Sequence, residues 1–478
     1  MLFNSLHFLA FFPVVLAMYF VLPHRFRWAW LLGTSCYFYA AFIPAYLLIL
    51  FVLILVDYVA GIAISGAEGP RRKAFLVLSL FANIGMLGFF KYYNFFAANL
   101  TGIGHGLGLP LSARTLAIVL PIGLSFHTFQ SMSYTIEVYR GAQKAERHLG
   151  IYALYVLFWP QLVAGPIERP QNLLHQFREP KRFDSRRAAE GAELMILGFA
   201  KKVLVADTLA KTVNVVYGAP HIHSGLSLAL AAYFFAFQIY YDFSGYSDIA
   251  RGAARVLGFD LMVNFERPYL SASISEFWRR WHISLSTWFR DYLFIPLGGS
   301  RVSHRRTALN LMIVFLVSGL WHGANWTFII WGALHGAALV GAQLLFGEHR
   351  KVAPVGGLRR AFHVLFTFHI VTLAWVFFRA DSVSKATYVL THLFSRNGAA
   401  SWAALPASPA QIMVAVFSVV ALEMVDTWLR RRKSTGKAAR PAMLSSGLRY
   451  ALAVGIMMLV LFRLTDERAP QQFIYFQF

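Results

Sequence analysis

Apolar residues dominate this chain in long runs, which are separated by short polar and basic stretches. A helix needs about 20 residues to cross roughly 30 Å of hydrocarbon, and runs close to that length recur. They lie at residues 8–22, 45–64, 74–90, 194–216, 226–243, 324–346, 362–378, 412–429 and 450–462. The pattern therefore predicts an all-α polytopic membrane protein, in which some of the shorter runs do not span.

Composition agrees with this prediction, since 58% of the 478 residues are hydrophobic and only 14% are charged. Soluble chains of this length carry more charge and form two to four domains. We see no internal repeat, and linker-like composition is limited to residues 397–410 and 430–446. A single integral membrane domain over residues 1–478 is the simplest interpretation.

The net charge of +22 comes from basic residues that gather in short loops, including 71–73, 140–147, 301–306 and 430–440. Lys and Arg near the ends of membrane segments are held on the cytoplasmic side, next to anionic lipid. The charge therefore predicts contact with membrane lipids and no nucleic-acid partner. Alternating sides along the chain places these loops inside and residues 99–112 outside.

A different pattern occurs between residues 271 and 306, where Trp, Phe, Arg and His are interleaved. Arg279, Arg280, Arg290 and Asp291 make a membrane crossing here unfavourable, because each charge costs a few kcal/mol at the bilayer centre. We expect a segment that is interfacial, re-entrant or buried in protein. An aromatic and basic helix on the membrane surface is the alternative.

His322 is the outstanding ionisable residue in apolar sequence, within the run V-S-G-L-W-H-G-A-N-W at 317–326. Helical rise from Ala308 puts it about 21 Å along a crossing segment, past the middle of the membrane. Ionisable residues inside a membrane are functional candidates by default. A structural histidine with satisfied hydrogen bonds is the alternative.

Several motifs follow one another in a specific order along the chain. They are Trp321-His322-Gly323, Trp331-Gly332, His335-Gly336, and the segments at 121–126, 164–167, 241–248, 277–282, 296–300 and 473–478. Together they resemble the membrane-bound O-acyltransferase superfamily, in its bacterial branch of polysaccharide O-acetylation proteins such as those that modify alginate. Two positions depart from that pattern: His127 replaces a more usual Tyr, and Glu137 a common Asp.

The resemblance implies a ring of tilted transmembrane helices, with re-entrant and interfacial helices around a central tunnel, in a bacterial inner membrane. It implies that His322 is essential and that His282 lies on the cytoplasmic side, which makes these two the catalytic candidates. It also implies acetyl-CoA as the acyl donor with no bound cofactor, an exported polysaccharide such as alginate as acceptor, and a separate periplasmic or membrane-anchored acetyltransferase as partner.

Moving an acetyl group from a thioester to an alcohol requires a base for the hydroxyl proton and donors for the oxyanion. We expect His322 to act as this base or to carry the acyl group itself. Asn325, the indole N–H of Trp321 and backbone N–H groups near Gly323 are the candidate oxyanion donors.

Coenzyme A is anionic, so its phosphates need a basic inner mouth. Arg279 and Arg280, with Trp281 and His282 beside them, are the candidates for binding it. Pairing of these arginines with lipid headgroups or with helix ends is the alternative.

No metal site is predicted. Asp242 and Asp248 lie in apolar sequence without a second cluster of ligands, so we expect them to pair with a buried Arg or to orient a His. Two other functions stay open at this point. One is transfer of D-alanine or another acyl group to a cell-wall polymer, and the other is a non-enzymatic polysaccharide transporter.

Overall fold

The computed structural model describes residues 1–110, 112–117, 120–163, 165–346, 356–395, 412–414, 416–424, 454–461 and 473–474. Within these ranges the regular structure is helical and no strand occurs, as the sequence predicts. The labelled helices of the amino-terminal half are α1 (Leu6–Val21), α2 (His24–Ala40), α3 (Tyr46–Gly66), α4 (Gly69–Leu87), η1 (Gly88–Tyr92), α5 (Tyr93–Gly106), α6 (Leu124–Arg140), α7 (Leu149–Leu157), α8 (Pro170–Leu173), η2 (Leu174–Phe177), α9 (Ser185–Phe199), η3 (Ala200–Ala206) and α10 (Asp207–Gly218).

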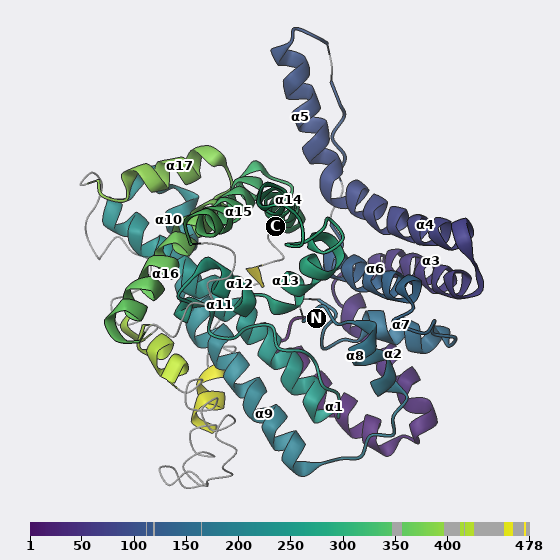
Figure 1. Ribbon diagram of the computed structural model, residues 1–478. Helices are drawn as coiled ribbons and strands as arrows, with labels where there is room; N and C mark the ends of the chain where they lie inside the picture. Colours follow the sequence, from purple (N-terminus) through teal and green to yellow (C-terminus); the bar gives the residue numbers. More distant parts are fainter. Residues whose placement is uncertain are drawn as a thin grey trace.

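The second half continues with helices of very different lengths. They are η4 (Pro220–Ile222), α11 (Gly225–Val256), η5 (Pro268–Leu270), α12 (Ile274–Arg280), α13 (Ile283–Phe289), η6 (Arg290–Phe294), α14 (His304–His322), α15 (Trp326–Phe346), α16 (Gly357–Arg379) and α17 (Val383–His392). In Figure 1 the long helices surround the short α12 and α13, which lie near the centre of the view. This arrangement agrees with the expected ring, whereas a continuous central tunnel stays a prediction.

Five helical stretches of the described residues are long and apolar enough to cross a membrane. They are Tyr46–Gly66, Gly69–Gly106, Gly225–Val256, Trp326–Leu345 and Gly357–Arg379. Each contains or overlaps a run predicted from the sequence, so the prediction of a polytopic protein is confirmed. Of the predicted segment 450–462 the structure describes residues 454–461, which are helical, and of 412–429 it describes 412–414 and 416–424; the remaining residues of both segments lie outside the described ranges.

Residues 99–112, which the sequence places outside, are helical as far as Gly106, because α4, η1 and α5 form one continuous helical stretch of 38 residues, the α4–α5 rod (Gly69–Gly106), which bends between α4 and α5 in Figure 1. Figure 1 shows α5 extending beyond the other helices. The run at 194–216 is helical but is not among the five stretches, because Lys201, Lys202 and Asp207 interrupt its apolar sequence and are buried in protein.

Buried ion pairs join this helical stretch to α11. Lys202 Nζ lies 2.8 Å from Asp207 Oδ1 and 2.6 Å from Asp242 Oδ1. Lys201 Nζ lies 2.6 Å from Asp248 Oδ2. Asp242 and Asp248 therefore pair with buried lysines, and Asp248 Oδ1 also lies 3.5 Å from Nη1 of the partly buried Arg251, so the expected arginine is present for Asp248 only. Satisfied pairs of this kind tolerate burial because each charge offsets the desolvation of its partner.

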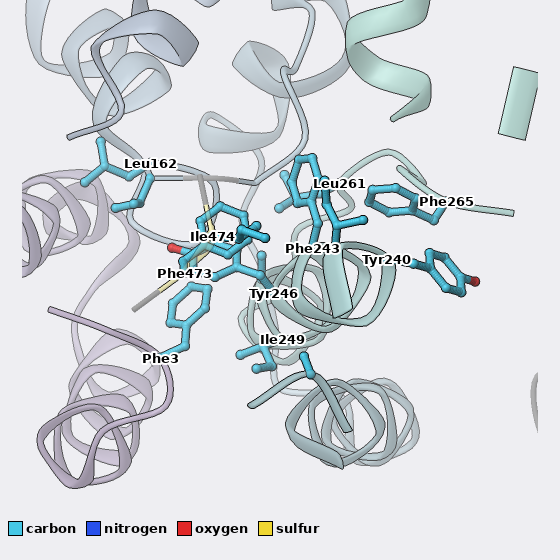
Figure 2. Packing of buried hydrophobic residues seen from close by; sticks show 14 of the residues in the cluster. Phe3, Leu162, Tyr240, Phe243, Tyr246, Ile249, Leu261, Phe265, Phe473 and Ile474 are labelled. Carbon is cyan, nitrogen blue, oxygen red and sulfur yellow. The ribbon is translucent and has the colours of Figure 1, made fainter. Parts of the chain in front are cut away.

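The carboxy-terminal segment reaches this same cluster. The backbone N–H of Ile474 donates to Asp242 Oδ2 at 2.6 Å. The ring of Phe473 lies 5.5 Å from that of Phe243 and 4.9 Å from that of Tyr246. Figure 2 shows Phe473 and Ile474 among buried side chains of α11 and of the amino-terminal segment, where Phe3 is located. Phe3 and Phe473 thus lie against the same core residue, Tyr246.

Small residues bring α14 and α15 into close contact. A Cβ atom at Gly332 would overlap the backbone oxygen of Phe315, and one at Gly319 would overlap that of Phe328. Close backbone approach of this type is typical of helix pairs in membranes. The two helices form a hairpin whose turn follows His322, so the packing of α15 fixes where that histidine lies.

The segment between 271 and 306 does not span, as the sequence predicts. It folds into α12, α13 and η6, each too short to cross a bilayer. Trp281 and Trp288 are buried, and the indole of Trp288 stacks on Phe129 with ring centroids 3.7 Å apart. Of the predicted alternatives, burial in protein describes this segment best.

Candidate functional site

A cavity of about 580 Å³ lies where several helix ends converge. The segments that line it are the α4–α5 rod near Lys91, the loop and helix start at 120–126, the α14–α15 turn and the end of α16. His322 and Trp321 form part of its wall, together with Arg379 and Asp381. Three of the residues predicted from the sequence, His322, Trp321 and Asn325, thus meet at one cavity.

His322 is the last residue of α14, and its side chain is 4% exposed. Its ring is surrounded by aromatic rings that meet it nearly edge to face. The centroids of Trp321, Trp331 and Phe378 lie 4.9, 5.0 and 5.2 Å away. Such packing holds the imidazole in one place and excludes water from most of its surface, while its remaining surface faces the cavity.

Trp321 separates the two catalytic candidates. Its ring lies 5.4 Å from that of Phe126 and 6.3 Å from that of His282. Within the described part of the chain, the buried indole nitrogen of Trp321 has no hydrogen-bond partner. That N–H is the kind of donor that an oxyanion or a substrate carbonyl accepts.

Asn325 lines the cavity, but both polar atoms of its side chain are already hydrogen-bonded. Its Oδ1 accepts from the backbone N–H of Thr327 at 3.0 Å, as a residue that caps the start of a helix does. Its Nδ2 donates to the backbone oxygen of Asp381 at 3.0 Å. Asn325 therefore ties α15 to the segment after α16, and its service as an oxyanion donor stays a prediction.

His282 lies behind Trp321 and outside the cavity-lining set. It is fully buried, with the ring of Phe243 4.6 Å and that of Phe126 6.2 Å away. Its φ of 42° is unusual for a residue other than glycine, and such strain is concentrated at functional sites. Burial holds the pKa of His282 below its ordinary value, so this imidazole is neutral at pH 7.

The donor-binding candidates on α12 lie apart from the cavity. Arg280 Nη2 pairs with Glu276 Oε1 at 2.6 Å, and Arg279 is exposed, with Nη1 donating to Ser275 Oγ at 2.9 Å. Trp281 is 1% exposed and packs 4.9 Å from the ring of Trp375. The structure gives Trp281 a packing role in the core, because so little of its surface is available to a substrate.

Two residues of this region, Lys91 and Arg379, were missed by the sequence reasoning, and His335 entered it only as part of a motif. Lys91 Nζ donates to the backbone oxygens of Trp321 at 2.6 Å and His322 at 3.0 Å. Arg379 Nη2 donates to Asn214 Oδ1 at 2.8 Å, and His335 Nδ1 lies 3.3 Å from the indole nitrogen of Trp278. Lys91 and Arg379 each directly follow a predicted apolar run, at 74–90 and 362–378. A cation directly at the end of an apolar run was the signal by which the sequence could have identified both residues.

The chain is similar to known proteins over most of its length. The model of the membrane-bound O-acyltransferase family matches residues 148–380, which include His282 and His322. The probable alginate O-acetylase AlgI of Azotobacter vinelandii is 41% identical over 399 residues, 83% of this chain and 78% of the relative. The peptidoglycan O-acetyltransferase of Helicobacter pylori is 36% identical over 439 residues, with coverages of 83% and 80%. The teichoic acid D-alanyltransferase of Streptococcus thermophilus is 31% identical over 293 residues, with coverages of 56% and 70%.

Proposed function

Because the chain belongs to the membrane-bound O-acyltransferase family, we propose that it moves an acetyl group from cytoplasmic acetyl-CoA across the membrane for O-acetylation of an exported polysaccharide, with His322 as the catalytic residue. It is an O-acyltransferase and a multi-pass membrane protein, so the non-enzymatic transporter is set aside. The observation that carries the role of His322 is its position in the wall of a cavity, held by three aromatic rings.

The reaction needs one proton acceptor. The acceptor hydroxyl attacks the thioester carbon, a C–O bond forms, and His322 takes the hydroxyl proton. The carbonyl oxygen then carries the negative charge of the tetrahedral intermediate. When the charge returns to the carbon, the C–S bond breaks and the thiolate receives the proton from His322. The products are the acetyl ester and free thiol.

The polarity of the helices supports an outward-facing cavity. α14 begins beside Arg305 and Arg306, and α16 begins beside Arg359 and Arg360, so the positive-charge rule places both starts inside. The opposite ends of α14 and α16 line the cavity. Acceptor hydroxyls thus enter from outside, while acetyl-CoA approaches from the cytoplasm across an inner membrane.

The names of two relatives support acetyl as the transferred group and a polysaccharide as the acceptor, since one is named for alginate and one for peptidoglycan. The sequence predicts only short outer segments, with little surface for a long polymer, which supports a separate periplasmic or membrane-anchored acetyltransferase as the final carrier. Deletion of that partner should abolish polymer acetylation while this protein is still inserted, and full acetylation without it would contradict the relay.

D-alanyl transfer is the second candidate function, because a teichoic acid D-alanyltransferase is also similar to this chain. That similarity covers 56% of the chain against 83% for the alginate relative. Feeding cells with labelled acetate or labelled D-alanine separates the two, because only the transferred group appears as base-labile label on the polymer.

Substitution of His322 tests the proposed mechanism. We expect His322→Ala and His322→Gln to lower acetylated product per inserted protein by about 10²–10⁴, the usual contribution of a general base. Gln keeps the size and the hydrogen bonds of His but accepts no proton at neutral pH. If His322 carries the acyl group covalently, the loss of activity is larger, and the parent protein retains an acetyl group after a quench.

The comparison of the two variants separates a catalytic histidine from a structural one. A structural role predicts that His322→Gln restores activity and that His322→Ala lowers mainly the amount of inserted protein. Near-normal specific activity in either variant would remove His322 from the mechanism and point to His282.

A further inference from the structure

Lys91 makes an unusual contact with the end of α14. It lies in η1, where the α4–α5 rod passes through a π-helical turn, a rare feature that is frequent at functional sites. Its ammonium donates to the backbone oxygens of Trp321 and His322, at 2.6 and 3.0 Å. The neighbouring Tyr92 hydroxyl donates to the backbone oxygen of Leu320 at 2.9 Å. Two adjacent side chains of the rod thus bind three successive carbonyl groups of α14.

These carbonyl groups lack partners inside their own helix, and they form the negative end of its dipole. A neutral donor is enough to satisfy such a group, as Tyr92 does for Leu320. A lysine in an otherwise apolar rod is much less favourable in a membrane. Capping of α14 alone therefore does not explain why the chain has a cation at position 91.

The surroundings of Lys91 leave its charge available to the cavity. Lys91 is only partly buried, and it lines the cavity together with His322. Among the residues that the structure describes, no carboxylate lies within ion-pair distance of its ammonium. An ammonium has three N–H donors, and two of them go to the carbonyl groups of α14. One N–H donor of the ammonium remains beside the catalytic histidine.

We propose that Lys91 is the oxyanion-stabilising cation of the acyl transfer at His322, an assignment that rests on the function proposed above. The contacts with α14 fix the ammonium relative to the imidazole, so little reorganisation accompanies the reaction. As the hydroxyl attacks, the thioester C=O electron pair moves to oxygen, and the remaining N–H of Lys91 donates to that oxygen. The pair returns to the carbon as thiolate leaves, and Lys91 keeps all its protons.

The test uses the full-length protein in proteoliposomes, with acetyl-CoA as donor and with the partner acetyltransferase and an alginate oligosaccharide on the acceptor side. Lys91→Met keeps the length and apolar stem of the side chain but removes the charge and the donors. We expect its kcat for thiol release to fall by about 10²–10³, the typical loss of one oxyanion donor, with KM for acetyl-CoA changed less than threefold. Lys91→Arg keeps the charge, so its kcat should be at least tenfold higher than that of Lys91→Met.

Two matched variants on the same rod separate catalysis from packing. Tyr92→Phe removes one carbonyl contact with α14 but no charge, and should lower kcat less than tenfold. Lys73→Met removes an exposed charge near the other end of the rod and should leave kcat unchanged. Amount of inserted protein and thermal unfolding midpoint are measured for every variant, and kcat is expressed per folded protein.

The outcomes are distinguishable. A Lys91→Met protein with kcat within threefold of the parent would overturn the proposal, as would equal losses in Lys91→Met and Tyr92→Phe, which indicate positioning of α14 only. If His322→Ala is inactive in the same assay while Lys91→Met is active, the inference on Lys91 fails and the proposed function stands. If His322→Ala retains activity, the proposed function fails, whatever Lys91→Met shows.

Discussion

At the scale of single residues, the two arginines of α12 differ in a way that the sequence does not reveal. The charge of Arg280 is offset by Glu276, whereas Arg279 is exposed and, among the described residues, its side chain is hydrogen-bonded to Ser275 alone. Arg279 is therefore the better candidate for a phosphate of coenzyme A, which it would bind in a bidentate manner. The structure therefore distinguishes Arg279 from Arg280, which the sequence does not.

We predict that the double variant Arg279→Ala, Arg280→Ala raises the KM for acetyl-CoA roughly fivefold or more while kcat is retained, because an exposed ion pair contributes about 1 kcal/mol. Most of the effect should come from Arg279. Arg305→Ala, Arg306→Ala is the matched control, since it removes two exposed charges at the start of α14. Equal donor kinetics in both double variants would assign Arg279 and Arg280 to lipid or packing.

At the scale of helices, the hairpin of α14 and α15 depends on backbone contact at Gly332 and Gly319. We predict that Gly332→Ala destabilises the protein by about 1–3 kcal/mol, the usual cost of overpacking, because its Cβ overlaps the backbone oxygen of Phe315. His322 would shift with α14, so specific activity should also fall.

Gly341 provides the control on the same helix. A Cβ there meets nothing within 4 Å, so Gly341→Ala should be neutral or slightly stabilising through helix propensity. Thermal unfolding in detergent and acetyl transfer per folded protein are the measurements. A Gly332→Ala protein as stable as Gly341→Ala would show that the hairpin relaxes without loss.

At the scale of the whole molecule, the continuous α4–α5 rod makes the membrane topology testable at both ends of one element. Its 38 residues correspond to roughly 57 Å of helical path, which bends between α4 and α5 (Figure 1) and exceeds the hydrocarbon thickness, so we expect its ends on opposite sides. The basic residues at 71–73 place the α4 end inside.

In a Cys36→Ser background, which lacks cysteine, we predict that Lys73→Cys is protected from an impermeant maleimide in intact cells and that His105→Cys reacts. Permeabilised cells should label both positions. Labelling of Lys73→Cys in intact cells would show that the topology is the opposite of the predicted one and that the cavity faces the cytoplasm.

The class of the fold and the main candidate residue follow from the order of residues along the chain. Runs of apolar residues predict helices because a bilayer interior demands internal backbone hydrogen bonds. Charge density excluded a crossing between 271 and 306, and the cost of isolated buried charges predicted partners for Asp242 and Asp248. His322 was found because an ionisable group in apolar sequence is rare, and the motifs around it gave it a role.

Only the tertiary structure decided which groups meet at the cavity. Lys91 reaches the carbonyl groups of Trp321 and His322 across more than 200 residues of sequence, and Ile474 reaches Asp242 over a similar separation. Likewise, the structure assigned Asn325 to a turn and Trp281 to the core. Periodicity shows which face of a helix is apolar, but the partner of that face and the crossing point depend on packing against the rest of the chain. The environment of His322 is therefore a property of the assembled helices.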